Sequence, residues 1–336
     1  MSFVVVIGAG LSGCTVACKL ADRDVSVILI EKTDRIGGKV RSYGCKAVAG
    51  KCQNCGVCLT AGLWDRVSNH KNIRLINNAV IRDITGKPGD FTVNITSGKE
   101  VIGFEEVHAV VVCTGFENLP GGISSHLHIE NTGGFQGVLT GTQLEKLLLG
   151  RTLTGLFENE PKSVAFVQCL GSRDINEGGL YCSKVCCSYS TRTAKLILDY
   201  YPGCKITFFY MELQNVKLGD YYTDLQKAGI DFIKCRPLKI TCGKPVLVEY
   251  EVPPEGIRDK AFDIVILSDG IHAGADNGRL AEVCGLIRDN DGFLQAAGTG
   301  SGVYVTGCAK APKKIDETYA DSLATAGKIL NSLSAI

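Results

Sequence analysis

The chain has almost no net charge and no long hydrophobic run. Its 36 Lys and Arg residues nearly balance 35 Asp and Glu residues, which leaves a formal net charge of +1. A nucleic-acid-binding surface needs a concentrated basic face, so we expect no nucleic-acid partner. No segment approaches the roughly 20 apolar residues that a membrane-spanning helix requires, so we expect no membrane span.

A secretory leader is also missing from the first residues. They read MSFVVVIGAG, with no basic segment and with an apolar run that ends in glycines. We therefore expect a cytoplasmic protein, in which clustered cysteines more often bind metal or carry out redox chemistry than form disulfides.

Cysteine, by contrast, is abundant, with 16 residues. Six of these cysteines lie on a predicted helix or in apolar strand-like runs, where free cysteine behaves as a small buried hydrophobe. They are Cys14, Cys18, Cys113, Cys204, Cys235 and Cys242. Most of the others fall in two dense groups, which call for a chemical explanation.

The hydrophobic pattern predicts an α/β fold. A strand at Val4–Ile7, a helix at Leu11–Ala21 and a strand at Val25–Ile30 form a βαβ unit, which implies a parallel sheet. A second alternation of strand and helix begins at Ser163, and the chain ends in a strand and a long helix. We predict two Rossmann-like dinucleotide-binding domains, the second inserted in the first: residues 1–150 and 266–336 form one, and residues 151–265 form the inserted one. Glu145 and Lys146 are predicted to lie on a solvated helix face.

The first strand runs into a glycine-rich loop with the pattern G-x-G-x-x-G. Gly8 permits a tight turn, Gly10 lets the backbone approach a pyrophosphate, and Gly13 allows close packing of helix on strand. The following helix offers free N–H groups and a positive dipole end to the phosphates. Glu31 ends the second strand, where its carboxylate can accept hydrogen bonds from a ribose. This context predicts a dinucleotide site.

The identity of the dinucleotide follows from a resemblance. The pair Gly37-Gly38, the strand end Thr114-Gly115 and the late Thr306-Gly307 resemble the flavin disulfide reductase and thioredoxin reductase superfamily. The resemblance implies that FAD binds in the first domain. Cys308 stands where the superfamily has an Asp, which removes the usual ribityl contact, whereas the Lys-rich start of the last helix favours electron density on the flavin. The implied FAD-binding residues are Gly8, Gly10, Leu11, Ser12, Gly13, Glu31, Lys32, Gly37, Gly38, Lys39, Val80, Thr114, Gly115, Gly307, Cys308, Lys314 and Ile315.

The inserted domain has no second glycine motif and instead carries a cysteine group. Cys169 follows an apolar strand, and Cys182, Cys186 and Cys187 follow in the pattern C-x12-C-x3-C-C. Four thiolates suit a [4Fe–4S] cluster, zinc or Cu(I). Adjacent cysteines fit a structural zinc site poorly, and a disulfide between Cys186 and Cys187 would be strained. The spacing therefore favours a cluster over zinc.

The residues of this segment carry a more specific resemblance. Cys169-Leu-Gly-Ser-Arg-Asp followed by Tyr181-Cys-Ser-Lys-Val-Cys-Cys resembles the A subunit of heterodisulfide reductase, as do the Gly37-Gly38 region and Pro312-Lys313. That resemblance implies that Cys169, Cys182, Cys186 and Cys187 bind a non-standard [4Fe–4S] cluster near the FAD. The long methanogen subunits carry extra ferredoxin-type motifs that this chain lacks. It therefore resembles the short A subunit of heterodisulfide-reductase-like complexes in sulfur oxidation. Arg192 stands where the long members often carry a Lys near the flavin.

The expected function is electron transfer between FAD and the cluster, with partner subunits of a heterodisulfide-reductase-like complex as donor or acceptor. The resemblance also implies a homodimer. Two alternatives remain open: a self-contained NAD(P)H-dependent flavin disulfide reductase, which the missing glycine motif disfavours, and a zinc-stapled flavin-binding scaffold. The second cysteine group, C-x6-C-x2-C-x2-C, leaves open a labile cluster, an exchanging thiol pair or a loop over the flavin. Its members are Cys45, Cys52, Cys55 and Cys58.

Overall fold

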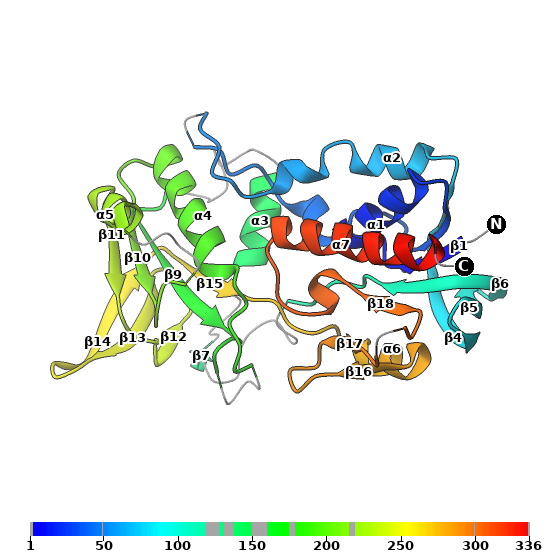
Figure 1. Cartoon of the computed structure of the whole chain (residues 1–336). Helices are drawn as coiled ribbons and strands as arrows, with labels where there is room; N and C mark the ends of the chain where they lie inside the picture. Colours follow the sequence, from blue (N-terminus) through cyan, green and yellow to red (C-terminus); the bar gives the residue numbers. More distant parts are fainter. Residues whose placement is uncertain are drawn as a thin grey trace. The chain divides into compact units, whose positions relative to one another are not determined.

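The chain forms two compact units that are interleaved along the sequence. In this computed structural model, the described residues are 3–48, 50–118, 128–130, 137–149, 160–174, 179–214, 219–298 and 300–334. Unit 1 comprises Met1–Ser42, Gly56–Glu117 and Ala273–Ile336, and unit 2 comprises Tyr43–Cys55 and Asn118–His272. Figure 1 labels their helices and strands.

Unit 1 is built on a seven-stranded sheet. Its strands are β1 (Phe3–Ile7), β2 (Ser26–Ile30), β3 (Ile73–Ile76), β4 (Ala79–Lys87), β5 (Asp90–Ser97), β6 (Glu100–Val112) and β18 (Val303–Val305). The order is β3-β2-β1-β6-β5-β4, and β18 pairs with β6. The pairs β1·β2, β2·β3, β1·β6 and β18·β6 are parallel, whereas β4, β5 and β6 form an antiparallel meander. The carboxyl ends of β1, β2 and β18 therefore lie at one edge, where such sheets bind ligands.

Helices cover both faces of this sheet. They are α1 (Leu11–Ala21), α2 (Leu63–Asn69), α6 (Asn277–Cys284) and α7 (Ile315–Ser334), with short 3-10 turns η1 (Gly38–Ser42), η2 (Val57–Thr60) and η3 (Gly307–Ala309) and a hairpin of β16 (Leu286–Arg288) and β17 (Leu294–Ala296). Val4 and Val6 pack with α1 and α7, whereas Val5 and Ile7 pack with α6 on the opposite face. This division follows from the strand period of two. None of the helices in the described part of the chain combines the length and apolar character needed to cross a membrane.

Unit 2 contains a parallel sheet whose two faces are both buried. Its strands are β7 (His128–Glu130), β8 (Val138–Thr140), β9 (Ser163–Leu170), β10 (Lys205–Phe209), β11 (Ile230–Ile233), β12 (Lys239–Thr241), β13 (Val246–Val252), β14 (Gly256–Phe262) and β15 (Ile264–Asp269), and its helices are α3 (Gly141–Leu149), α4 (Cys186–Tyr200) and α5 (Gly219–Lys227). The parallel sheet has the order β11-β10-β9-β15-β8, and a second sheet has the order β14-β13-β12-β7. Phe166 packs against residues of α3, α4 and α5, and Val167 packs against residues of β13. A strand buried on both faces explains the unbroken apolar run of β9.

The observed units differ in their bounds from the predicted domains. Unit 2 begins at Asn118 instead of residue 151, because β8 pairs in parallel with β15 and α3 also packs on this sheet. It ends at His272 instead of residue 265 and also takes in the segment Tyr43–Cys55. Hydrophobic periodicity marks elements but not the sheet to which each belongs, so it could not reveal these exchanges.

An ion pair holds the segment Tyr43–Cys55 to α3. The Lys46 ammonium is 2.6 Å from Glu145 Oε2 and donates to the carbonyl of Gly44 at 2.8 Å. The side chains of Lys46 and Glu145 are only 4% and 12% exposed. Burial raises the pKa of Glu145, and the charge and hydrogen bond of Lys46 oppose that shift. The prediction that Glu145 lies on a solvated face was therefore wrong, because its partner comes from a distant part of the chain.

Lys46→Met should lower the free energy of unfolding by about 3–5 kcal/mol, because it leaves the Glu145 carboxylate buried without a cation. The double variant Lys46→Met/Glu145→Leu should recover most of that loss. Arg66→Met removes an exposed pair with Asp22 and serves as the control, with an expected loss below about 1 kcal/mol. Urea unfolding followed by circular dichroism measures all three, and equal losses in the Lys46 and Arg66 variants would contradict the prediction.

Candidate functional site

The glycine-rich loop of unit 1 is packed so tightly that side chains are excluded at two of its positions. Gly8 has φ +97°, and a Cβ there would lie 2.7 Å from the carbonyl oxygen of Cys113. A Cβ at Gly13 would overlap the carbonyl of Gly8. Gly10 is the N-cap of α1 and provides no side-chain cap, so the first N–H groups of α1 stay open to a ligand. This is the geometry that a bound pyrophosphate requires.

Glu31 is fixed beside this loop. Its carboxylate is buried, and Oε2 accepts the N–H of Ala9 at 2.9 Å. Oε1 accepts the N–H and the hydroxyl of Thr33 at 2.9 and 2.8 Å. These bonds hold the carboxylate at the carboxyl end of β2, next to the glycine loop, where a ribose hydroxyl could donate to its remaining lone pairs.

The glycine pair approaches the same loop from the other side. The N–H of Gly37 donates to the carbonyl of Ala9 at 2.7 Å, and a Cβ on Gly38 would lie 3.0 Å from Gly10 Cα. Gly37 and Gly38 have φ values of +111° and +54°. The next residue, Lys39, holds its ammonium 5.2 Å from the ring centre of Phe116. The structure therefore brings Gly10 and Gly38 together, and at position 38 this approach and the positive φ favour glycine.

The end of β18 closes on the start of α1. Gly307 has φ +69°, and a Cβ there would overlap the hydroxyl of Ser12. Cys308 is buried, and its thiol donates to the carbonyl of Lys313 at 3.5 Å and lies 3.7 Å from the Thr318 hydroxyl. The thiol is thus bonded within its own segment.

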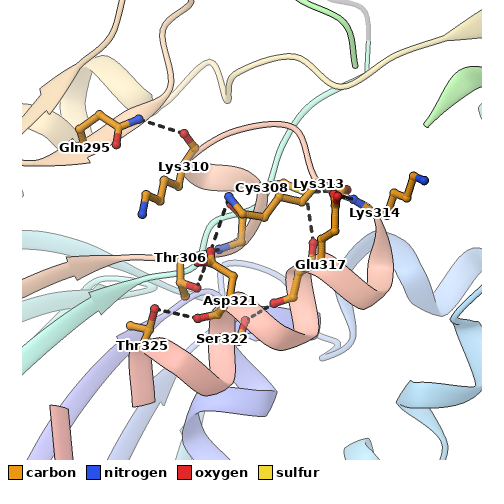
Figure 2. Close-up of polar contacts among 12 residues, drawn as sticks. Gln295, Thr306, Cys308, Lys310, Lys313, Lys314, Glu317, Asp321, Ser322 and Thr325 are labelled. Atoms are coloured by element: carbon orange, nitrogen blue, oxygen red, sulfur yellow. Dashed lines mark hydrogen bonds and ion pairs between the residues drawn. The ribbon is translucent and has the colours of Figure 1, made fainter. Parts of the chain in front are cut away.

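A carboxylate that the sequence analysis did not single out, Asp321, binds the turn that follows β18. Asp321 of α7 accepts the N–H of Gly307 at 2.9 Å and the hydroxyl of Thr306 at 3.0 Å, as Figure 2 shows. The ammonium of Lys313 lies 3.5 Å from Asp321 and donates to the carbonyl of Gly307 at 3.2 Å. Lys313 is therefore neutralised locally. At the start of α7, the N–H of Lys314 donates to Glu317 Oε2 at 2.9 Å, and the Lys314 side chain points away from Asp321 in Figure 2.

The remaining predicted flavin residues also lie in unit 1. Thr114 and Gly115 follow β6, and Gly115 has φ +77° and open space where a Cβ would lie. The side chain of Val80 is 43% exposed, and Lys32 is exposed. Ile315 is half-buried and packs in the core beside α1.

In unit 2 the structure brings three of the four predicted cluster ligands into contact. Cys169 lies near the end of β9, and Cys186 and Cys187 begin α4, whose Cys186 thiol hydrogen-bonds with the thiols of both. The bond to Cys186 lowers the pKa of Cys169 to about 7, with further lowering by Arg173 and Arg236, and it also lowers the pKa of Cys187. The bonds to Cys169 and Cys187 raise the pKa of Cys186. The site thus favours thiolates at Cys169 and Cys187.

Cys182 lies in the same loop, where its sulfur accepts the N–H of Lys184 at 3.3 Å. Across the described residues, no three Cys, His, Asp or Glu side chains stand in an arrangement that would hold a metal ion. The fit to a cluster therefore rests on the chemistry of the donors: soft sulfur atoms, three of them in contact, on a loop with half-buried cations.

The loop that carries these cysteines has an unusual backbone. Cys169, Arg173 and Lys184 all have positive φ, at +63°, +57° and +63°. Arg236 fastens the loop: its guanidinium bonds Asp174 at 2.6 Å and the carbonyls of Cys169 and Ser172 at 3.2 Å each. Side chains in the left-handed region cost energy and persist only where the surroundings enforce them, often at functional sites.

The second cysteine group is divided between the units. Cys45, Cys52 and Cys55 belong to unit 2 and Cys58 to unit 1, and Cys55 is half-buried while the other three are exposed. Arg192 on α4 donates to the carbonyls of Gln53 at 2.8 Å and Asn54 at 3.2 Å. Its observed role is therefore to hold this loop on the helix that carries Cys186 and Cys187.

Comparisons with known proteins agree with this geometry. A family profile described as NAD(P)-binding Rossmann-like domain matches residues 6–58. The chain is 26% identical over 425 residues to the A subunit of the ferredoxin/F420H2-dependent CoB-CoM heterodisulfide reductase of Methanosarcina acetivorans, covering 98% of this chain and 53% of that protein. It is 26% identical over 424 residues to the A subunit of the H2:CoB-CoM heterodisulfide,ferredoxin reductase of Methanothermobacter marburgensis, covering 96% of this chain and 62% of that protein. The chain thus spans little more than half the length of the first relative. Both alignments are longer than this chain, which indicates that both relatives carry insertions.

Solved structures establish the fold. Thioredoxin reductase of T. acidophilum superposes with a TM-score of 0.65 at 17% identity over 99% of this chain and 98% of its own. The flavoprotein disulfide reductase RclA of Escherichia coli superposes with a TM-score of 0.62 at 15% identity over 98% and 71%. The predicted fold class, α/β with a thioredoxin-reductase-like arrangement, is confirmed. All four of these relatives are oxidoreductases by name.

Proposed function

We propose that this chain binds FAD in unit 1 and one [4Fe–4S] cluster in unit 2, and that it transfers electrons between them and partner subunits of a heterodisulfide-reductase-like complex. The observation that carries the proposal is the placement of Cys169 near the carboxyl end of β9 and of Cys186 and Cys187 at the start of α4. In a Rossmann-like domain, this edge of the sheet is where a nucleotide binds. Here the first turn after the strand holds thiols and no glycine motif.

The proposed cluster takes the place and the role of the nicotinamide cofactor of related reductases. A flavin exchanges two electrons and can release them singly, and a cluster carries one at a time. Chemistry on the sulfur substrate would then belong to other subunits. Sulfur oxidation as the process, the cytoplasm as the location and a homodimer as the assembly are parts of the same proposal, and they rest on the resemblance to the short A subunit.

On the FAD side, the chain's own residues bind and orient the cofactor. The N–H groups at the start of α1 would hold the pyrophosphate, and Glu31 would accept hydrogen bonds from the adenosine ribose. Gly38 and Gly307 would allow the backbone to close on the cofactor, since side chains at either position would meet Gly10 or Ser12.

Full-length protein purified without oxygen should contain one FAD and four iron and four sulfide ions per chain. Flavin released by denaturation, with iron and sulfide assays, measures this. NADH and NADPH should not reduce the bound flavin at a catalytic rate, because unit 2 lacks the glycine motif for them. Rapid bleaching by either nucleotide would instead support a self-contained flavin disulfide reductase, and zinc without iron would support a scaffold.

A further inference from the structure

Arg173 occupies a costly position in the cysteine loop. Its φ is +57°, a region that residues with a side chain rarely adopt. Its N–H donates to the carbonyl of Tyr181 at 3.1 Å, which closes the loop between Cys169 and Cys182. A glycine would adopt this backbone without cost, so the Arg side chain itself calls for an explanation.

The Arg173 side chain is mostly buried, and only one of its two terminal nitrogens has a hydrogen-bond acceptor among the described residues. Arg173 Nη2 lies 3.0 Å from Glu212 Oε2, and the Arg173 side chain is 23% exposed. Nη1 is fully buried, and it has no hydrogen-bond partner among the described residues. A buried unpaired donor on a charged group is expensive, and native structures rarely keep one without a function.

The surroundings of Arg173 are the predicted cluster ligands. Arg173 lies between Cys169 and Cys182 in the chain, and its N–H bond to the carbonyl of Tyr181 holds it in the loop that joins these two cysteines. The residue that holds Arg173 also contacts this group directly, because the Cys187 thiol lies 3.8 Å from the carbonyl oxygen of Glu212. Arg173, Glu212 and Cys187 thus form one continuous set of contacts.

We infer that Arg173 donates its Nη1 N–H to a sulfur of the cluster and sets the cluster's reduction potential, with Glu212 as the residue that positions and partly offsets its charge. This inference rests on the proposed cluster. Hydrogen bonds to cluster sulfur and nearby net charge are two of the factors that fix the potential of an iron–sulfur centre. A buried cation stabilises the reduced, more negative cluster, and an exposed carboxylate 3.0 Å from that cation weakens the effect.

The test compares Arg173→Met with Glu212→Gln in the full chain. The midpoint potential of the cluster is measured by titration under electron paramagnetic resonance. Arg173→Met should favour the oxidised cluster by about tenfold or more, a shift of about 59 mV to lower potential for a one-electron couple. Glu212→Gln should shift the potential in the opposite direction and by less, because Glu212 is 58% exposed and screened.

Arg258→Met and Glu255→Gln are the matched controls, because they change an exposed ion pair beside β13 and β14 of the same unit. Neither should move the potential. Shifts of one sign in both test variants, or no shift in either, would overturn the inference. If Arg173→Met loses its iron, Glu212→Gln decides alone: an upward shift supports the role and an unchanged potential overturns it. Absence of iron from the wild-type chain would instead defeat the proposed cluster, and the inference with it.

Discussion

Gly10→Val protein is expected to fold and to purify without FAD. A Cβ at position 10 would meet only Gly38 Cα, at 3.9 Å, and the φ and ψ of Gly10 are −77° and −166°, which suit a valine. The protein therefore tolerates the side chain, whereas a pyrophosphate that must approach the backbone does not. A clash of about 3 kcal/mol weakens binding about 100-fold. Flavin fluorescence after denaturation measures the occupancy, and circular dichroism confirms folding.

Two further variants separate lost binding from lost structure. Gly327→Ala adds a methyl group in α7, where nothing lies within 4 Å, and should keep its FAD and the stability of the wild-type chain. Gly13→Ala would place its Cβ on the Gly8 carbonyl and should destabilise unit 1 itself. Gly10→Val protein with a full complement of FAD would disprove the assignment of this loop.

The fold was predictable because its strongest signals are local. The helix at Leu11–Ala21 has the predicted bounds, since an apolar strand, a glycine loop and a helical period follow one another without interruption. The position of Glu31 follows from the same unit. The contribution of β8 and α3 to unit 2 was not predictable, because it depends on a parallel pairing with β15, more than a hundred residues later.

In the candidate site, too, some features follow from the local sequence and others depend on contacts between distant segments. Residue type and spacing singled out the four cysteines as cluster ligands, which stays a prediction, but could not indicate the left-handed backbone at Cys169 and Lys184 that shapes their loop. Arg173 stood inside the quoted motif, and a cation among thiolates was the signal that could have singled it out. Asp321 gave no such signal, because its bonds to Thr306 and Gly307 depend on how α7 returns along β18.

Cys187→Ser should lose most of the iron and keep the FAD. Serine presents a hard oxygen where the cluster needs a soft thiolate. Cys186 and Cys187 both lie in the first turn of α4, so the substitution removes one of the two sulfurs there. The FAD should stay, because its glycine loop and Glu31 lie in unit 1 and Cys187 lies in unit 2. Iron, sulfide and flavin assays on protein purified without oxygen measure both cofactors in one sample.

Two cysteine controls make this result specific. Cys235→Ser changes a half-buried thiol elsewhere in unit 2, and Cys52→Ser changes an exposed thiol of the second group. Both should retain iron and FAD at the wild-type ratio. Full iron in Cys187→Ser would show that the predicted ligands do not bind a cluster; these are Cys169, Cys182, Cys186 and Cys187. Loss of iron in Cys52→Ser, with Cys187→Ser intact, would assign the metal to the loop that Arg192 holds on α4.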